Sequence, residues 1–299
     1  MLRAMNRWVA GARPRTLPAA IVPVLVGTAA AADGELGAGR GLEAWRFAAA
    51  LLVALAIQIG TNYANDYSDG VRGTDSNARV GPVRLVGSGL ATASAVKRAA
   101  LVSFGGAALA GLALAIAVTP WLLLVGALSF AAGWLYTGGP RPYGYYGFGE
   151  LFVFVFFGLV ATMGSAYVQE EQLSWLAFGT AIPVGFLATA LLVVNNLRDI
   201  DSDAVAGKRT LAVRIGDKPT RILYTVLVVA PFVITPIVAG LGGRPLASAA
   251  LFAVLLARLP VQHVIEGRKG VALIPVLGET GRVQLVFGVA FAGGLFFGS

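Results

Sequence analysis

The chain of 299 residues is 57% hydrophobic and only 13% charged, with a formal net charge of +8. Soluble domains carry roughly 25% charged residues, so this composition predicts a polytopic membrane protein. The absence of cysteine excludes disulfides and thiolate metal sites, and a single histidine excludes histidine-cluster sites. The positive charge indicates loops that face a cytoplasm and anionic lipid, not a nucleic-acid partner.

Apolar stretches about long enough to cross a bilayer recur along the whole chain. We predict nine transmembrane helices, near residues 17–32, 44–62, 98–118, 120–136, 150–168, 173–195, 220–240, 245–262 and 283–298. The connections between them hold no extramembrane domain. Residues 1–299 are therefore expected to form a single all-α membrane domain.

The basic residues predict the orientation of this domain. With the N-terminus in the cytoplasm, all but three of the 23 Lys and Arg residues fall in cytoplasmic segments, the exceptions being Arg40, Arg46 and Arg244. Such a bias is the one that orients membrane proteins. The connections after the second and sixth helices are long and lie on the same side. Because long loops are usually functional, we expect the chemistry at the cytoplasmic face.

Two clusters of acids and amides end the second and sixth predicted helices, in the stretches NYANDYSDG and NNLRDIDSD. In each cluster, a 3.6-residue period places one asparagine and two aspartates on one helix face. These residues are Asn62, Asp66 and Asp69 in the first cluster, and Asn195, Asp199 and Asp203 in the second. Four carboxylates in one site repel each other unless a divalent cation bridges them. An all-oxygen site favours Mg²⁺, with Mn²⁺ as the alternative.

Basic residues in glycine-rich loops follow each cluster. Carboxylate-bound metal beside Arg and Lys forms a clamp for a diphosphate, and the residues expected in this role are Arg79, Arg84 and Lys208. A third loop, YTGGPRPYGYYGFGE, contains Arg141, Tyr143 and Tyr145. It either lines a pocket whose rings stabilise a cation or forms an interfacial turn with a tyrosine belt.

A diphosphate clamp that opens toward apolar helices suits a long-chain isoprenyl diphosphate. Loss of the diphosphate gives an allylic cation, which an electron-rich acceptor attacks. The alternative from another class is a cation transporter that uses the acids as ion ligands. That alternative does not explain why both clusters lie at helix ends beside basic loops, away from the middle of the membrane.

The motifs NDYSD and NNLRDIDSD resemble the two aspartate motifs of the UbiA superfamily of membrane prenyltransferases. Longer stretches are similar to the members that prenylate 1,4-dihydroxy-2-naphthoate in menaquinone biosynthesis. They are ARPRTLPAAIVPVLVG, QIGTNYANDYSDGVRGTD with RVGPVRLVGSG, LYTGGPRPYGYYGFGELFVFVFFG and NNLRDIDSDAVAGKRTLAVRIG. The resemblance runs to about Gly216 and implies a UbiA-like bundle of nine transmembrane helices in a bacterial plasma membrane.

The resemblance also implies roles for single residues. The four aspartates would bind Mg²⁺, and Asn62 and Asn195 would orient the diphosphate or a metal-bound water. The residues that would bind the diphosphate or a carboxylate of the acceptor are Arg79, Arg84, Arg141 and Lys208. The family usually has another acid where this chain has Gly73, which leaves the role of Asp75 open.

The implied reaction joins a polyprenyl diphosphate to 1,4-dihydroxy-2-naphthoate with release of diphosphate and CO2, giving a demethylmenaquinol. Another aromatic acceptor, such as 4-hydroxybenzoate, stays open because the third loop alone separates the two. The residue that takes the phenolic proton also stays open, with Tyr143, Tyr145 and Glu150 as the candidates.

Overall fold

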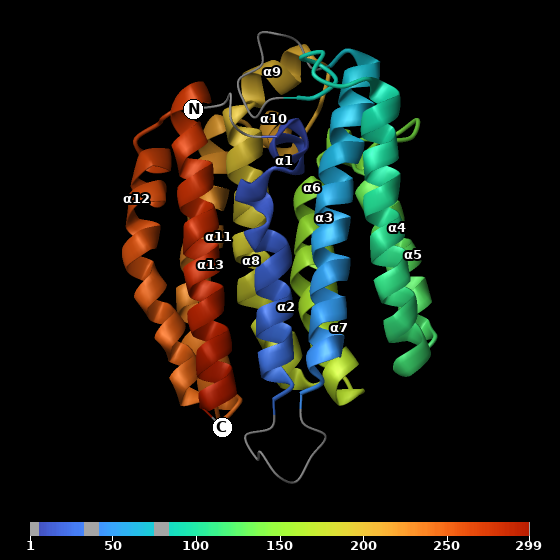
Figure 1. Cartoon of the computed structure of the whole chain (residues 1–299). Helices are drawn as coiled ribbons and strands as arrows, with labels where there is room; N and C mark the ends of the chain where they lie inside the picture. Colours follow the sequence, from blue (N-terminus) through green and yellow to red (C-terminus); the bar gives the residue numbers. More distant parts are fainter. Residues whose placement is uncertain (1–5, 33–41, 75–83, 299) are drawn as a thin grey trace.

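The computed structural model describes residues 6–32, 42–74 and 84–298, which form a bundle of helices packed side by side (Figure 1). Seven helical segments of this part of the chain are long and apolar enough to cross a membrane. They are α3 (Ala44–Arg72), α4 (Ala93–Ala117), the run of α6 (Gly149–Val153), η4 (Phe154–Val160) and α7 (Ala161–Glu170), α8 (Trp175–Arg198), α11 (Asp217–Leu241), η5 (Pro245–Ala253) with α12 (Val254–Ile265), and η6 (Gly270–Leu273) with α13 (Ile274–Phe297).

Two further apolar helices are shorter, α2 (Pro18–Ala30) and α5 (Trp121–Leu135). Each predicted apolar segment coincides with one of these helical runs, and together they make the chain a membrane-integral protein. The count of nine crossings and the cytoplasmic N-terminus stay predictions, because α2 and α5 fall short of the spanning length among the described residues.

Short helices gather at the end of the bundle where α3 and α8 finish, drawn at the top of Figure 1. We call this the polar end. It carries α1 (Arg7–Ala12), η2 (Pro14–Thr16), η3 (Tyr143–Tyr146), α9 (Ile200–Val205) and α10 (Leu211–Ile215). Helix α3 runs ten residues past its predicted end and stops at Gly73, whose φ of 68° suits a glycine C-cap. The first aspartate cluster is therefore helical throughout.

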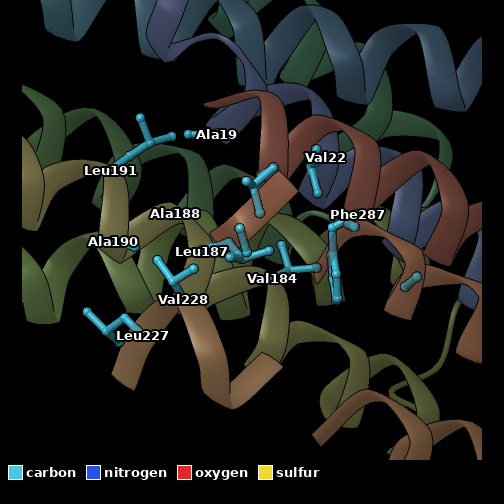
Figure 2. Packing of buried hydrophobic residues seen from close by; sticks show 14 of the residues in the cluster. Ala19, Val22, Val184, Leu187, Ala188, Ala190, Leu191, Leu227, Val228 and Phe287 are labelled. Carbon is cyan, nitrogen blue, oxygen red and sulfur yellow. The ribbon is translucent and has the colours of Figure 1, made fainter. Parts of the chain in front are cut away.

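Helix α8 forms the centre of the largest apolar cluster. Its Val184 and Leu187 are fully buried and pack among Val22 of α2, Val228 of α11 and Phe287 of α13 (Figure 2). A helix that is apolar on all sides is buried among other helices, and α8 has the largest buried share of the spanning segments. This packing holds the second aspartate cluster in a fixed position at the polar end.

Two pairs of helices approach so closely that only glycine fits between them. A Cβ at Gly27 of α2 would lie 2.0 Å from the carbonyl oxygen of Thr162 on α7. A Cβ at Gly158 would lie 2.6 Å from the Cα of Gly185 on α8. Small residues at membrane helix interfaces allow this approach. Gly158 belongs to η4, which is a π-helix of seven residues, and such segments occur frequently at functional sites.

At the end opposite the polar end, two arginines bind helix-terminal carbonyl groups. The Nη1 of Arg46 donates to the carbonyl oxygen of Val168 at 2.8 Å, and the Nη2 of Arg244 donates to that of Ala32 at 2.8 Å. The last carbonyls of a helix have no partner within the helix, so such donors stabilise its C-terminal end. This structural use explains why basic residues occur on the side predicted to be poor in them.

Candidate active site

A cavity of about 460 Å³ lies inside the bundle and reaches the polar end. Most of the predicted site residues line it, and they are Asn62, Asp69, Arg84, Tyr143, Tyr145, Asn195, Asp203 and Lys208. They come from α3, the turn before α4, η3, α8, α9 and the segment before α10. The polar end of the cavity thus joins loops that are far apart in the sequence.

Away from the polar end, the wall of the cavity consists mainly of apolar side chains and glycines. Residues such as Leu112, Phe130 and Val160 line it, together with Gly126 and Gly164, where an added Cβ would meet no atom within 4 Å. Along α3 the lining runs from residue 50 to residue 69, a rise of about 28 Å at 1.5 Å per residue. The cavity is therefore nearly as long as the hydrocarbon core of a bilayer is thick, about 30 Å.

Asp69 is the residue on which three separate segments of the polar end converge. Its Oδ2 lies 2.9 Å from the Nζ of Lys208 and 3.5 Å from the Nη2 of Arg84. Its Oδ1 accepts a hydrogen bond of 2.5 Å from the hydroxyl of Tyr145. The Nζ of Lys208 also lies 4.9 Å from the centre of the Tyr145 ring. Burial and the neighbouring Asp69 charge raise the pKa of Tyr145, so its phenol stays protonated and continues to donate.

Asp66 has a different environment from the one that the helical period predicts. It is fully buried but does not line the cavity, and its two oxygens accept from the backbone N–H groups of Leu85 at 2.7 Å and Val86 at 3.0 Å. Asp66 keeps the helical spacing that places it near Asn62 and Asp69, but its carboxylate is used by the turn at Leu85 and Val86 and does not reach the cavity. The α3 residues that line the cavity are Gln58, Thr61, Asn62, Asn65 and Asp69. Asp66 instead holds the turn that carries Arg84 against α3.

The second cluster keeps the predicted spacing of four residues in its backbone hydrogen bonds, from Asp199 N–H to Asn195 and from Asp203 N–H to Asp199, but its two aspartates have different surroundings. Helix α8 ends at Arg198, Asp199 has non-helical angles (φ −96°, ψ 6°), and α9 begins at Ile200. Both oxygens of Asp199 accept from Arg198 at 2.7 Å, and a third donation from Arg198 reaches the Oδ1 of Asn195 at 2.9 Å. Asn195 and Asp203 line the cavity, whereas Asp199 does not. The carboxylate of Asp199 is thus paired with Arg198, whereas Asp203 faces the cavity.

The tyrosines of the third loop form one wall of the polar end. Tyr143 stacks on Phe152 with ring centres 4.0 Å apart, and its hydroxyl donates to the carbonyl oxygen of Ala132 at 2.8 Å. Tyr136 meets the edge of Tyr143 at 5.5 Å and also lines the cavity. Burial raises the pKa of both phenols, so the wall consists of neutral aromatic rings. Of the two alternatives for this loop, the structure favours the pocket wall.

The remaining predicted site residues lie in different places in the structure. The Nδ2 of Asn62 donates to the carbonyl oxygen of Ala12 at 2.9 Å, which attaches α3 to the short helix α1. Arg141 is exposed and does not line the cavity. Arg79 and Asp75 lie outside the described residues.

Four residues that the sequence analysis did not select also line the polar end. They are Arg13, Asn65, Tyr136 and Asn196. The Oδ1 of Asn65 accepts a hydrogen bond of 2.8 Å from the hydroxyl of Thr137, at the start of the third loop. Two of the four sit directly beside selected residues, and Arg13 belongs to the quoted stretch ARPRT. Their position within or beside the quoted motifs was the sequence signal that could have identified them as site residues.

Two of the four aspartates predicted to bind magnesium are placed where they could do so. Within the described ranges, no three Asp, Glu or His side chains lie close enough together to hold a metal ion. Asp69 and Asp203 both line the polar end of the cavity and offer only oxygen donors. Magnesium is typically bound through one or two carboxylates, with water and substrate phosphates as the other ligands. The four-aspartate metal site stays a prediction, and two of its residues fit.

A membrane-embedded helical bundle with a cavity that is charged at one end and apolar along its length is the architecture of an enzyme for amphipathic substrates. A model described as the UbiA prenyltransferase family matches residues 20–272. The chain belongs to the UbiA prenyltransferase family. This membership excludes the cation transporter considered as an alternative.

Relatives and solved structures agree with this family. The chain is 52% identical to the 1,4-dihydroxy-2-naphthoate octaprenyltransferase of Mycobacterium tuberculosis, over 99% of each chain. It is 37% identical to the protein of the same name from Escherichia coli, over 97% of this chain and 94% of that one. A UbiA homologue from Aeropyrum pernix K1 in its apo form has a TM-score of 0.69 at 13% identity, over 96% of this chain and 98% of that one. One from Archaeoglobus fulgidus bound to GPP and Mg²⁺ has a TM-score of 0.63 at 13% identity, over 96% and 100%. These two structures share the fold of the chain.

Proposed function

We propose that the protein transfers a polyprenyl chain from its diphosphate to 1,4-dihydroxy-2-naphthoate, in the biosynthesis of menaquinone. The relatives that cover nearly the whole chain carry this activity in their names. The single structural observation that carries the proposal is the cavity. It joins a charged end to an apolar channel of membrane-spanning length inside one bundle.

The shape and polarity of the cavity match the donor substrate. An isoprenyl diphosphate has a highly charged head and a long apolar tail, and binding energy from the tail holds the head in place for reaction. In the proposed complex the diphosphate lies at the polar end near Lys208 and Arg84, whose charges offset its own. The tail follows the apolar wall past Phe130 and Gly164. The apolar lining of this path disfavours water, which would protect a reactive cation from hydrolysis.

Asp69 and Asp203 are the residues proposed to hold Mg²⁺ beside the diphosphate. When bound, the ion neutralises charge that develops on the leaving diphosphate. The basic side chains do the same from the protein side, and Lys208 and Arg84 already lie beside the Asp69 carboxylate. UbiA homologues from Archaeoglobus fulgidus bound to DMAPP and Mg²⁺ or to GPP and Mg²⁺ support the use of this metal. Asp66 then acts by holding the turn that carries Arg84 against α3.

The aromatic wall is proposed to serve the acceptor and the allylic cation. Loss of diphosphate leaves positive charge on the first carbons of the prenyl chain, and the faces of neutral aromatic rings stabilise such a charge. Tyr136, Tyr143 and Tyr145 supply these faces at the polar end. The electron-rich naphthoate ring forms the new carbon–carbon bond, and diphosphate and CO2 leave.

We further propose that the whole chain acts as one prenyltransferase domain in a bacterial plasma membrane, with nine crossings. The polar end would face the cytoplasm, because nearly all basic residues fall on that side. Reaction of externally added, membrane-impermeant reagents with cysteines introduced at either end of the bundle tests this orientation. Labelling of a cysteine at exposed position Arg141 from the outside of intact cells would contradict it.

The experiment for the reaction uses the purified protein in detergent. It is incubated with 1,4-dihydroxy-2-naphthoate and geranylgeranyl diphosphate, with and without Mg²⁺, and mass spectrometry detects the prenylated, decarboxylated product. We expect magnesium-dependent product from the native protein and none from Asp203→Ala. Product with 4-hydroxybenzoate alone would preserve prenyl transfer and overturn the acceptor. Absence of product with any aromatic acceptor would overturn the proposed function.

A further inference from the structure

Glu150 is a buried carboxyl group that none of the interactions described so far explains. It is the second residue of α6 and only 7% exposed. Its Oε1 accepts a hydrogen bond of 2.9 Å from the Nδ2 of Asn196 on α8. Its Oε2 is buried and has no hydrogen-bond partner among the described residues. Burial of a carboxyl group with so few partners is costly, so its retention needs a reason.

The contact with Asn196 offers a reason for a buried carboxyl group at position 150. This contact determines how the amide of Asn196 is oriented. In this contact the amino group of Asn196 faces Glu150 and donates to its Oε1. Asn196 is itself 5% exposed and lines the cavity, whereas Glu150 stands behind it. With its amino group turned to the wall, the amide has its carbonyl oxygen left to serve the cavity. Donation to a carboxylate also polarises the amide and makes that oxygen a stronger acceptor.

The surroundings of Asn196 suit a flat aromatic ring that carries a hydroxyl group. Tyr136 and Tyr143 line the cavity beside α8, and a Cβ at Gly149, the residue before Glu150, would lie 3.1 Å from the ring of Tyr136. The charged groups of the polar end, Lys208 and Arg84, come from other segments and lie around Asp69. The aromatic wall, the acceptor oxygen of Asn196 and the charged groups around Asp69 therefore all border the same polar end of the cavity.

We infer that Asn196, oriented by Glu150, accepts the hydrogen bond of a phenolic hydroxyl group of the acceptor. Glu150 is a positioning residue in this arrangement, since it acts on the acceptor only through Asn196. As the ring forms its bond to the prenyl chain, positive charge spreads to the hydroxyl oxygen and strengthens its donation. The interaction is then stronger in the transition state than in the bound substrate, which is the condition for a rate effect. This inference rests on the proposed function and adds a recognition element for the acceptor.

The test measures the KM of the acceptor and that of the prenyl diphosphate separately. We expect Asn196→Ala to raise the acceptor KM about tenfold, to lower kcat several-fold because the hydrogen bond strengthens in the transition state, and to leave the donor KM within twofold. Glu150→Gln should raise the acceptor KM about threefold, because glutamine can present either group to Asn196. Thr189→Val is the matched control, since Thr189 is buried on the same helix and its hydroxyl donates to the carbonyl oxygen of Gly185 within that helix.

A reciprocal exchange separates this role from simple packing. Asn196→Asp places two carboxyl groups side by side and should raise the acceptor KM more than tenfold. Adding Glu150→Gln restores a donor and an acceptor, with an oxygen facing the cavity, and should return the acceptor KM to within about threefold of the native value. An increase in both KM values, or a return of melting temperature without recovery of the acceptor KM, would overturn the inference.

A second readout uses binding without turnover, so that misfolding of a variant does not decide the outcome. Quenching of tryptophan fluorescence reports binding of the acceptor and of its methyl ethers in the absence of prenyl donor. The native protein should bind an ether that lacks the recognised hydroxyl about tenfold more weakly than the parent acceptor. Equal binding of all the ethers would contradict the inference. Failure of the proposed function has a different signature, namely no product from the native protein with this acceptor.

Discussion

The Nζ of Lys208 lies 2.9 Å from the Oδ2 of Asp69, and this ion pair joins the segment after the second aspartate cluster to the end of the first. Both side chains are almost completely buried, with 6% and 2% exposed. A buried charge without its partner is strongly destabilising, so the two groups depend on each other. The pair places a cation where the proposed diphosphate would bind.

Replacement of Lys208 by methionine should lower kcat/KM by about 100-fold, because loss of one preorganised charge that stabilises the transition state has effects of this size. The KM for the prenyl diphosphate should rise, while the KM for the acceptor should change little. Steady-state kinetics with each substrate varied in turn gives both values. Lys218→Met is the control, since Lys218 is exposed on α11. Activity within twofold of native in Lys208→Met would argue against a role for this residue at the diphosphate.

The two kinds of aspartate should respond differently to replacement by asparagine. In Asp66→Asn, one of the two N–H groups of Leu85 and Val86 loses its acceptor, which costs about 1–3 kcal/mol of stability. The apparent melting temperature in detergent should fall by several degrees. In Asp203→Asn it should change little while product formation falls at least 100-fold. Thermal unfolding and initial rates measured on the same preparations distinguish the two. Equal melting temperatures for both variants would contradict the structural role of Asp66.

A larger residue in the apolar channel should limit the length of the prenyl chain. Gly164 lines the cavity on α7, and an added Cβ there meets no atom within 4 Å. Gly164→Leu should therefore fold normally and still use farnesyl diphosphate, while the KM for longer donors rises. Gly105→Leu serves as the control because Gly105 is exposed on α4 and also has open space around it. Competition between donors of different length, followed by mass spectrometry, reports the preference. An equal loss of activity with farnesyl diphosphate and with longer donors would refute a specific effect on the binding of the prenyl tail.

The tyrosines of the polar end should make stability depend on pH at the alkaline limit. Burial raises the pKa of Tyr145, and the Asp69 charge raises it further above the ordinary value of 10. The folded state therefore keeps the proton above pH 10, whereas the unfolded chain loses it, so stability falls as the pH rises beyond 10. Tyr145→Phe should weaken this decrease between pH 9 and pH 11. Melting temperatures across that range test it, and an identical slope in the variant would contradict the assignment.

Much of the architecture followed from hydropathy alone. The apolar segments coincide with the helical runs because membrane helices must satisfy their backbone groups internally and present apolar side chains to lipid. The interior cavity at the ends of α3 and α8 also matches the predicted location of the chemistry. Asp69 and Asp203, one from each motif, line it together.

The partners of individual polar residues could not be derived in the same way. A helical period places Asp66 near Asp69, but only the position of the turn after α3 decides that Asp66 receives two backbone N–H groups. Likewise, the helical period places Asp199 on a face with Asn195 but does not determine that its carboxylate pairs with the adjacent Arg198. Asn196 went unnoticed because its partner, Glu150, lies on another helix.

The π-helical turn of η4 has a consequence for how the protein can change. A π-helix closes i→i+5 hydrogen bonds, so each such turn accommodates one more residue than an α-helical turn does. Deletion of a single residue between 154 and 160 would allow an ordinary α-helix to form. The later side chains of α7 would keep their present facing, because the residue lost is the one that the wider turn accommodates. A deletion in α7 ahead of Gly164 has no such turn to absorb it and would rotate Gly164 away from the cavity by about 100°. The segment η4 is therefore the place where this helix can change its length without altering the lining of the channel.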